Sequence, residues 1–458
     1  MLSALTQSFS ASTLFPRTLS AMMTDASSNS IMRDYAKCIF CDRCVDACES
    51  QSLNVYEESD DPEPPITVGN APLKDTNCIS CGQCAVVCPV DCLYEKDASK
   101  TVLETLKNKN KNGKICVAIT APSVRVGISE EADLPAGTDS TGQMVAALKA
   151  FGFDYVFDTN TGADLTIMEE GTELLSRLGQ GTMFTSCCPG WVNMVEKVYP
   201  ELIPNLSSCR SPQGMAGAVI RHKFSQVLGV KPEDIYLVSF MPCTAKKDEI
   251  KREQLSGDID EVCTVREFGR MLTAEKVDLK ALPAADFDEF FGESTGGGDI
   301  FGASGGVMEA ALRFAHEAAT GKPAPNVEFD GAVRPGKAGI KEATVALDGK
   351  ELKVAVVSGG DNIAKLIKRI KAGDKFDFVE VMACPGGCVG GGGMPKGKAF
   401  KKNVPKRAEG LYSIDRSKGH RKSQENDTLQ RLYASMLGGA PGSHEAHELL
   451  HTTYSPRQ

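Results

Sequence analysis

The sequence lacks several features that define common protein classes. No stretch of about 18 apolar residues occurs in the 458-residue chain, so no segment has the composition of a membrane-spanning helix. An excess of basic residues is also missing, because the formal net charge at pH 7 is −9, which argues against nonspecific binding to nucleic acid. We therefore expect neither a membrane nor a nucleic acid as a partner. The hydrophobic content of 41% is ordinary and allows a sizeable core.

Nucleotide-binding and protease motifs are absent or incomplete. No G-x-G-x-x-G occurs, and the two G-x-x-x-x-G-K stretches at 331–337 and 392–398 continue with Ala338 and Ala399. Both therefore lack the Ser or Thr that would bind magnesium in a phosphate-binding loop. Residues 447–451 match the metalloprotease motif H-E-x-x-H, but only seven residues follow to supply a later third ligand. We interpret this stretch as an amphipathic C-terminal segment.

Cysteine, by contrast, is abundant. The 17 cysteines are odd in number and repeat in metal-ligand spacings, which favours a reducing compartment and metal clusters over disulfides. Two runs have the spacing C-x2-C-x2-C-x3-C: Cys38, Cys41, Cys44 and Cys48, then Cys78, Cys81, Cys84 and Cys88. This spacing resembles the bacterial ferredoxin pattern for two [4Fe–4S] clusters. Zinc is disfavoured, because zinc sites pair C-x-x-C units rather than join three cysteines to a fourth.

The ferredoxin pattern implies that the two runs exchange their fourth ligands. Each fourth cysteine, expected at the start of a helix, would bind the other cluster. The expected ligand sets are Cys38, Cys41, Cys44 and Cys88 for one cluster, and Cys78, Cys81, Cys84 and Cys48 for the other. Glu49 departs from the pattern, which prefers Pro there, and Cys92 is an extra thiol that we expect to be buried rather than to bind iron.

The length of 458 residues gives a prior of about three domains. Residues 1–30 begin with a stretch rich in Ser and Thr that contains one Arg and no acid before Asp25, which is typical of an organellar transit peptide. A disordered leader is the alternative. We expect an organelle, with the chloroplast stroma favoured over a mitochondrion or hydrogenosome, and the cytoplasm otherwise. Residues 31–103 would form a small α+β ferredoxin-like domain, 104–114 a linker rich in Lys and Asn, and 115–458 a catalytic domain.

From residue 115 the chain alternates strand-like and helix-like patterns, which predicts an α/β domain with parallel sheets. One helix should follow Ser140 or Thr141 and end at Gly152. Strands at 182–185, 235–240 and 376–381 each run into a loop that contains cysteine. Since open parallel sheets bind ligands at the carboxyl ends of their strands, these loops can meet in one crevice.

Those loops carry the clearest resemblance in the chain. T-S-C-C-P-G-W at 185–191, M-P-C-T-A-K-K-D-E at 241–249 and M-A-C-P-G-G-C at 382–388 look like the three motifs of [FeFe]-hydrogenases, in order. The similarity extends from about residue 37 to near the C-terminus and includes 163–170 and 301–310. It implies two lobes with parallel sheets and an H-cluster between them. That cofactor is a [4Fe–4S] cubane joined to a diiron unit that carries CO, cyanide and a bridging dithiolate.

The resemblance also implies roles for individual residues. The cubane would be held by Cys188, Cys243, Cys384 and Cys388, with Cys388 bridging to the diiron unit. Lys246 would face a cyanide ligand, which is sensible electrostatics for a cation beside a bound anion. The diiron pocket would be lined by Pro122, Ser123, Gln213, Met241, Phe301 and Met382.

A route for protons follows from the same motifs. Cys187 matches the cysteine that does not bind iron and passes protons to the dithiolate, a task that a thiol with a pKa near about 8.5 can perform. Glu170 and Glu173 lie three residues apart on one expected helix and therefore share a face. With Ser207 they match the rest of the family's proton path. Without the resemblance, two such glutamates would be interpreted as solvated surface.

The expected activity is reversible reduction of protons, 2H⁺ + 2e⁻ ⇌ H₂. The main alternative is a Narf-like iron–sulfur assembly protein, but that group is expected to lack the cysteine pair at 187 and 188. A hydrogen sensor is a second alternative, although no extra signalling domain is visible. Expected partners are ferredoxin, which is generally acidic, and hydrogenase maturation proteins, and the expected state is a monomer. The basic stretch at 396–422 could steer ferredoxin, or it could be a solvated loop.

Overall fold

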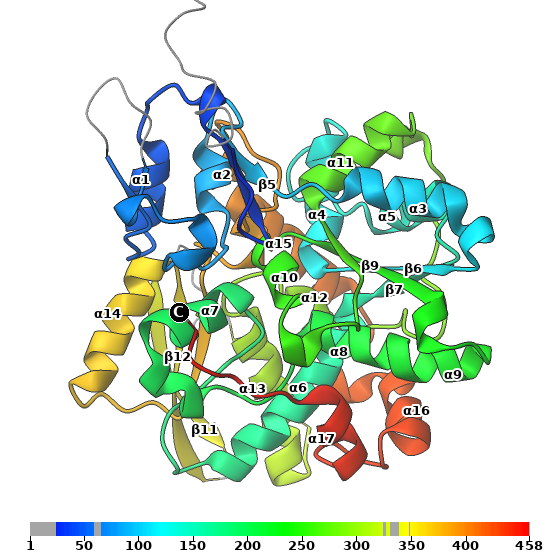
Figure 1. The fold of residues 1–458 in the computed structure, drawn as a ribbon. Helices are drawn as coiled ribbons and strands as arrows, with labels where there is room; N and C mark the ends of the chain where they lie inside the picture. Colours follow the sequence, from blue (N-terminus) through cyan, green and yellow to red (C-terminus); the bar gives the residue numbers. More distant parts are fainter. Residues whose placement is uncertain (1–23, 59–65, 324–326, 330–338, 348, 458) are drawn as a thin grey trace, which may run out of the picture.

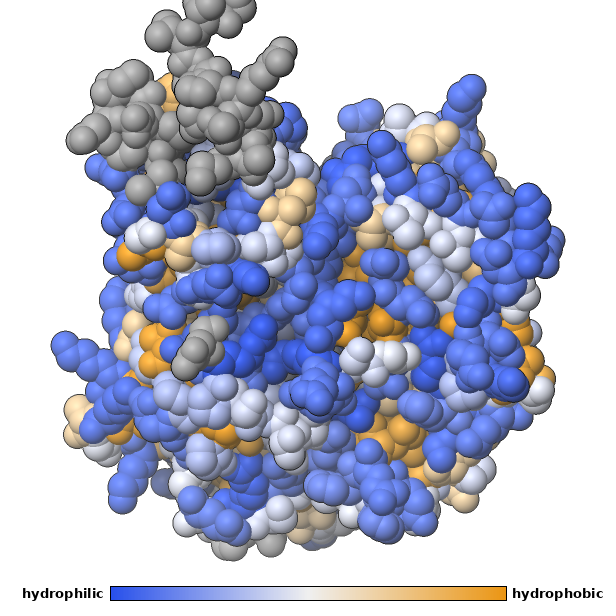
Figure 2. All heavy atoms as spheres, viewed as in Figure 1, coloured by the Kyte–Doolittle hydropathy of each residue, from blue (hydrophilic) through white to orange (hydrophobic). Residues whose placement is uncertain are grey.

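The computed structural model describes residues 24–58, 66–323, 327–329, 339–347 and 349–457. A small N-terminal domain sits on a larger body in which two sheets lie side by side, each with helices packed against it (Figure 1). On the face drawn in Figure 2 the surface is mostly hydrophilic, and its apolar residues form separate small groups. None of the helices in the described part of the chain is both long and apolar enough to cross a lipid bilayer.

The N-terminal domain is built from short elements. Its main sheet has the antiparallel order β1-β2-β5, and a second hairpin pairs β3 with β4. The elements are β1 (Thr24–Asp25), β2 (Ile31–Asp34), α1 (Arg43–Glu49), β3 (Tyr56–Glu57), β4 (Ile66–Thr67), α2 (Gln83–Val87) and β5 (Leu93–Glu95). Because β1 pairs with β2, the folded domain includes residues 24–30, which we had expected to belong to the leader. Residues 1–23 of that leader lie outside the described part.

The fourth cysteine of each run lies at the end of a helix rather than at its start. Cys48 falls in the last turn of α1, and Cys88 directly follows the last residue of α2. Each helix begins after a left-handed residue, Asp42 at φ 51° and Gly82 at φ 73°, so the turn that starts the helix also bends the chain around the first three cysteines. The expected position was therefore wrong.

The expected linker at 104–114 is also wrong, because it is largely helical. Helix α3 (Ser99–Asn112) ends at Gly113 in the left-handed conformation, φ 63°. Val102 and Leu106 lie one turn apart on its inner face and are buried in the core. The Lys and Asn residues that suggested a linker form the solvated outer face. Helix α3 therefore joins the two domains as a packed element.

The larger body contains the two predicted lobes. The first sheet has the order β10-β9-β6-β7 and is entirely parallel. The second has the order β11-β12-β13-β8, in which only the edge strand β11 is antiparallel. The strands are β6 (Ile115–Thr120), β7 (Tyr155–Asp158), β8 (Met183–Phe184), β9 (Ile235–Met241), β10 (Glu261–Thr264), β11 (Ile340–Leu347), β12 (Lys350–Ser358) and β13 (Phe378–Met382). The predicted fold class is confirmed.

Helices pack on both sheets and between them. The first lobe carries α4 (Pro122–Glu131), α5 (Thr141–Phe151), α6 (Thr159–Arg177), α8 (Pro212–Val219) and α11 (Val265–Ala274). The second carries α7 (Pro189–Val198), α13 (Gly306–Thr320) and α14 (Gly360–Lys371). Helix α5 has the predicted limits, since it follows Ser140 and stops at Gly152 in the left-handed conformation.

The C-terminal segment wraps around these lobes. Helix α15 (Phe400–Ser417) packs against α4 and α12 (Gly296–Ile300), α16 (Asp427–Met436) against α6, and α17 (His444–Leu450) against α8. Residues 447–450 thus lie in helix α17, and His451 directly follows it.

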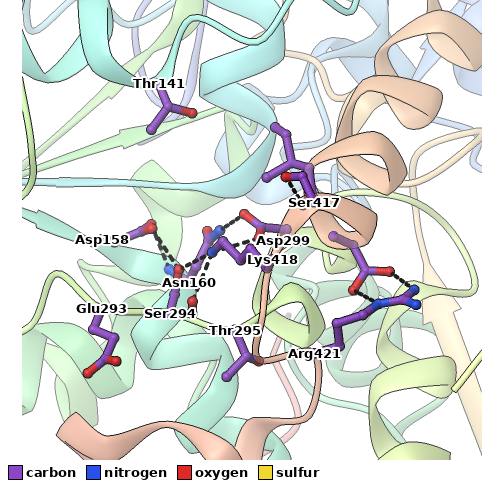
Figure 3. A network of polar contacts seen from close by, with 12 residues as sticks. Thr141, Asp158, Asn160, Glu293, Ser294, Thr295, Asp299, Ser417, Lys418 and Arg421 are labelled. Atoms are coloured by element: carbon purple, nitrogen blue, oxygen red, sulfur yellow. Dashed lines mark hydrogen bonds and ion pairs between the residues drawn. The ribbon is translucent and has the colours of Figure 1, made fainter. Parts of the chain in front are cut away.

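A buried polar network anchors the end of α15 (Figure 3). Lys418 forms an ion pair with Asp299 at 2.7 Å, and the Asn160 amide donates to Asp299 at 2.6 Å. The Arg125 guanidinium bridges Asp299 and Asp158 at 3.1 and 2.7 Å. These contacts fix α4, α6 and α12 relative to one another, and the starts of α4 and α6 and the end of α12 border the cavity described next.

Candidate active site

The three cysteine loops leave the sheets at the carboxyl ends of β8, β9 and β13, as predicted. Cys188 precedes the first residue of α7, and its Sγ accepts a hydrogen bond from the Ala383 N–H at 3.4 Å. Burial raises the pKa of the Cys243 thiol to about 12, and the neighbouring Cys188 adds to the rise. Burial likewise raises the pKa of Cys384, with Cys243 and Cys188 adding to it. The structure therefore brings these thiols together, with Cys388 beside them.

The glycine-rich loop after β13 allows very close backbone contacts. Gly387 has φ 90°, and a Cβ there would lie 2.6 Å from the Ser304 nitrogen. A Cβ on Gly392 would collide with the Cys81 carbonyl oxygen of the N-terminal domain. The loop also bonds to that domain, since the Gln83 amide donates to Gly390 O at 3.0 Å. The second cysteine run is consequently packed directly against the crevice.

A cavity of about 60 Å³ opens beside these thiols, and all six predicted pocket residues line it. Cys187, Lys246 and Cys388 line it as well. The expected cubane ligand Cys243 also lies in the lining, together with residues that were not assigned to the pocket from the sequence: Ala121, Thr159, Ala163, Pro212, Pro242 and Gly302. Thr159 could have been found from its place directly after strand β7, at a carboxyl strand end.

The chemistry of this lining fits a bulky cluster with small polar ligands. Ser123 Oγ and Thr159 Oγ1 are buried and have no hydrogen-bond partner in the described residues. Such atoms are rare in proteins, so each is a candidate contact for a bound group. Much of the remaining lining is apolar, including the side chains of Met241, Met382 and Phe301, and would exclude water around the group.

Lys246 lines the cavity and is held in place by polar contacts. Burial lowers its pKa, but the Glu249 carboxylate at 2.9 Å outweighs burial and raises it, so the ammonium stays charged. The Gln213 amide donates to the same Glu249 at 2.9 Å and accepts from Ser239 at 2.8 Å. Glu249 thus orients both Lys246 and Gln213. This role of Glu249 was not predicted from the sequence, although its (i, i+3) spacing from Lys246 was a usable signal.

The expected proton-path residues run from the cavity towards the surface. Glu170 is 1% exposed, and burial raises the pKa of its carboxyl to about 8. Burial and the nearby Glu170 raise the pKa of Cys187. The Ser207 hydroxyl donates to Glu173 at 2.9 Å, and Glu173 pairs with Arg177 at 2.9 Å. The Glu173 and Arg177 side chains are 14% and 24% exposed, so this series of groups becomes more accessible outwards.

The C-terminal segment packs beside the outer part of this series. His451 Nδ1 lies 2.8 Å from Ser208 Oγ, and its Nε2 lies 3.1 Å from a Glu169 carboxylate oxygen. The Tyr433 hydroxyl donates to the same carboxylate at 2.5 Å. Glu173, Cys209 and His451 approach one another closely enough to hold a metal ion, but both ring nitrogens and the Glu173 carboxylate already have partners. We therefore assign this group to the polar network.

In the N-terminal domain the cysteines form the two expected groups. Cys38, Cys41, Cys44 and Cys88 line one pocket together. Burial raises the pKa of the Cys48 thiol to about 12, and the nearby Cys78 adds to the rise. Burial also raises the pKa of Cys84, with Cys78 and Cys48 adding to it. The Tyr56 hydroxyl contacts Cys84 Sγ at 3.9 Å. Cys88 therefore lies with the first run and Cys48 with the second, which is the arrangement that an exchange of the fourth ligands requires. Cys92 is buried, as expected.

The basic stretch at 396–422 divides into two parts. Arg407, Lys418, Arg421 and Lys422 form ion pairs within the fold. Lys398, Lys401 and Lys402 are exposed, and Lys396 pairs with Asp91 of the N-terminal domain. Fewer charges are thus free for a partner than the count in the sequence suggested.

Comparison with known proteins agrees with this geometry. Residues 114–392 match a family model described as iron only hydrogenase large subunit, C-terminal domain, 401–457 match iron hydrogenase small subunit, and 37–92 match a 4Fe-4S dicluster domain. A relative named NADP-reducing hydrogenase subunit HndD, from Solidesulfovibrio fructosivorans, is 42% identical over 94% of this chain and 75% of its own length. A solved [FeFe]-hydrogenase of Chlamydomonas reinhardtii is 39% identical and covers 79% of this chain and 99% of its own, with a TM-score of 0.68.

A second group of relatives has another role. Protein NAR1 of Arabidopsis thaliana is 31% identical over 84% of this chain and 85% of its own length. Related proteins are named cytosolic Fe-S cluster assembly factors. The fold by itself therefore does not separate the two functions, and the residues of the crevice must do so.

Proposed function

The chain belongs to the iron-only hydrogenase family, with two [4Fe–4S] clusters and an H-cluster as its cofactors, and we propose that it catalyses reversible reduction of protons to H₂. One observation carries the proposal. The crevice that gathers Cys188, Cys243, Cys384 and Cys388 also holds a free thiol, Cys187, backed by a series of proton-carrying groups that reaches the surface.

In this proposal Cys188, Cys243, Cys384 and Cys388 would hold the cubane, with Cys388 nearest to the diiron unit. The H-cluster, when bound, would supply the redox chemistry of proton reduction. Lys246, held charged by Glu249, would offer its ammonium group to an anionic ligand of the diiron unit and so orient that unit. Ser123 and Thr159 offer hydroxyl contacts, and the apolar side chains of Met241, Met382 and Phe301 exclude water so that the charges act in a low dielectric.

Protons travel through this chain's own side chains. Glu173 exchanges protons with solvent, Ser207 relays them, Glu170 stores them, and Cys187 hands them on inside the cavity. A carboxyl pKa of about 8 suits Glu170 to this task, because the group is mostly protonated at neutral pH but lies within about one pH unit of its pKa, so it can both give and take a proton.

Infrared spectroscopy and hydrogen production test the proposal. Protein co-expressed with hydrogenase maturation proteins should show CO and cyanide bands and should evolve H₂ from a reduced dye. An iron–sulfur assembly role, which the NAR1 relative suggests, predicts neither signal from protein that still carries its [4Fe–4S] clusters. A hydrogen sensor would show the bands with only weak turnover.

We also propose ferredoxin as the electron carrier and an organelle, with the chloroplast stroma favoured, as the location. The two cluster groups between the surface and the crevice support a one-electron carrier, and the Ser- and Thr-rich start of the chain supports targeting. A fluorescent protein fused after residue 30 should enter the organelle, and diffuse cytoplasmic signal would contradict targeting. Stopped-flow oxidation of reduced ferredoxin by the purified enzyme tests the carrier.

A further inference from the structure

Arg33 is buried in the N-terminal domain without a polar partner. It lies in the central strand β2, where its backbone pairs with Asp25 of β1 and Leu93 of β5. The residue is 1% exposed, and its Nε, Nη1 and Nη2 atoms make no hydrogen bond to any described residue. Asp25 is near, but its carboxylate is occupied by the backbone N–H groups of Ser27 and Leu73.

Other fully buried arginines of the described chain are treated differently. Arg125 pairs with Asp158 and Asp299, Arg313 with Glu309 and Asp415, and Arg407 with Glu130. An unpaired charge in the protein interior is strongly unfavourable, whereas a charge opposite an anion is tolerated. The environment of Arg33 therefore calls for an anion that is not a carboxylate of the described chain.

The position of Arg33 indicates which anion this is. Its side chain lines the same pocket as Cys38, Cys41, Cys44 and Cys88. The rings of Tyr35 and Tyr56 hold the guanidinium, at 4.1 and 5.2 Å from ring centroid to Cζ. A [4Fe–4S] cluster with four thiolate ligands is an anion, and it gains a further negative charge on reduction.

We propose that Arg33 is the counter-cation of the cluster held by Cys38, Cys41, Cys44 and Cys88, and that it raises the reduction potential of this cluster. A buried cation favours the more negative, reduced state, and the low dielectric strengthens the effect. The cation near the other group is Lys197, which influences Cys78 but is half-buried and donates to Thr76 O at 2.8 Å. Two clusters with the same ligand spacing thus differ by one buried charge.

This difference would give the outer cluster a storage role. Cys81 of the other group lies against the crevice, where a Cβ on Gly392 would collide with its carbonyl oxygen, whereas the exposed side chains of Ile39 and Phe40 flank Cys38 and Cys41. An electron that arrives from outside would first rest on the Arg33 cluster. Hydrogen formation needs two electrons, so a reservoir near the surface lets a one-electron carrier leave before the second arrives.

A redox titration of the fully loaded enzyme tests the proposal. The spin of the reduced clusters is integrated by electron paramagnetic resonance at a series of applied potentials, for the wild type, Arg33→Gln and Arg33→Lys. We expect Arg33→Gln to shift the reduction equilibrium of one cluster about tenfold towards the oxidised state, which is about 59 mV for one electron. The other cluster should keep its potential, and Arg33→Lys should stay near the wild type.

Arg43→Gln is the matched control. Arg43 lines the same pocket and carries the same charge, but it is exposed, so solvent screening should hold its effect below about twofold. Equal shifts in Arg33→Gln and Arg43→Gln, or no shift in a fully loaded Arg33→Gln protein, would overturn the proposal. The iron content of each variant shows whether the cluster is lost. Loss of iron in Arg33→Gln but not in Arg33→Lys supports a counter-cation. Loss of iron in both variants would overturn the proposal, because the shape of the Arg33 side chain rather than its charge would then be required.

Discussion

The two regions of the molecule that gather cysteines, the N-terminal domain and the crevice, place the same type of ligand in different environments. In the N-terminal domain the cysteines lie on two short helices and in the loops that flank them; Cys41 is exposed, and Ile39 and Phe40 beside it are 54% and 43% exposed. In the crevice the cysteines lie at the ends of buried strands between two sheets. Electron transfer needs only short distances, but proton chemistry needs excluded water and a defined proton route. The following changes test whether that division is real.

The largest effect is expected from Cys187→Ala. It removes the thiol that faces the cavity, so turnover should fall by about 10²- to 10⁴-fold, the usual worth of a positioned acid–base group. Infrared bands for CO and cyanide should remain, because Cys187 is not an expected iron ligand. Cys263→Ala, which removes an equally buried thiol from β10, should keep its turnover. Loss of iron from the Cys187 variant would make this residue a ligand.

Glu170→Gln should change the turnover rate and the pH dependence of the free energy of unfolding. The pKa of Glu170 is raised to about 8 in the folded state, so ionisation is resisted by the fold and stability is lost as pH rises from the unfolded value through 8. The variant escapes this loss. Its free energy of unfolding relative to the wild type should therefore increase by up to about 1.4 kcal/mol per pH unit across that window. The free energy of unfolding of both proteins is measured by chemical denaturation from pH 5 to 9. A difference between them that does not change with pH would contradict a raised pKa.

Cys38→Ala and Cys78→Ala probe the electron side of the comparison. Either change should reduce turnover with ferredoxin about tenfold or more while leaving turnover with a small reduced dye within about twofold, provided that the dye reaches the H-cluster directly. Both rates are measured on protein whose infrared bands are intact. Equal losses with the two donors would show that the N-terminal clusters support the crevice structurally rather than relay electrons.

The smallest effect is expected at the surface lysines. Reversing the charge of Lys396, Lys398, Lys401 and Lys402 should raise the KM for ferredoxin severalfold at low salt and flatten its salt dependence. Reversal at Lys365 and Lys368, exposed on α14, is the matched control. Unchanged ferredoxin kinetics would place the carrier on the N-terminal domain, near Ile39 and Phe40, although residues 31–100 contain 13 Asp and Glu against 6 Lys and Arg.

The sequence predicted what depends on local pattern. Strand ends carrying cysteine, and the spacing of the two runs, were enough to place Cys243, Cys388 and the expected cluster groups. Helix α3 was not predicted, because only a few of its residues are apolar and buried, and the many Lys and Asn residues between them resemble a linker. The roles of His451 and Glu169 could not be seen, since their contact spans 282 positions. Arg33 gave no signal, because an unpaired buried charge is recognisable only once its surroundings are known.

The collision that any side chain at Gly392 would make with the Cys81 carbonyl oxygen has a consequence for kinetics. Arg266 reinforces that seam, since it donates to Gly392 O at 2.7 Å and also pairs with Glu95 of the N-terminal domain. Because the two domains are closely packed at Gly392, no hinge lies between them. The distance between the inner cluster and the crevice is therefore fixed, whereas it would vary if the N-terminal domain were attached by a flexible tether. Electron flow inside the molecule should then be indifferent to solvent viscosity, and glycerol or sucrose should slow only the encounter with the external carrier.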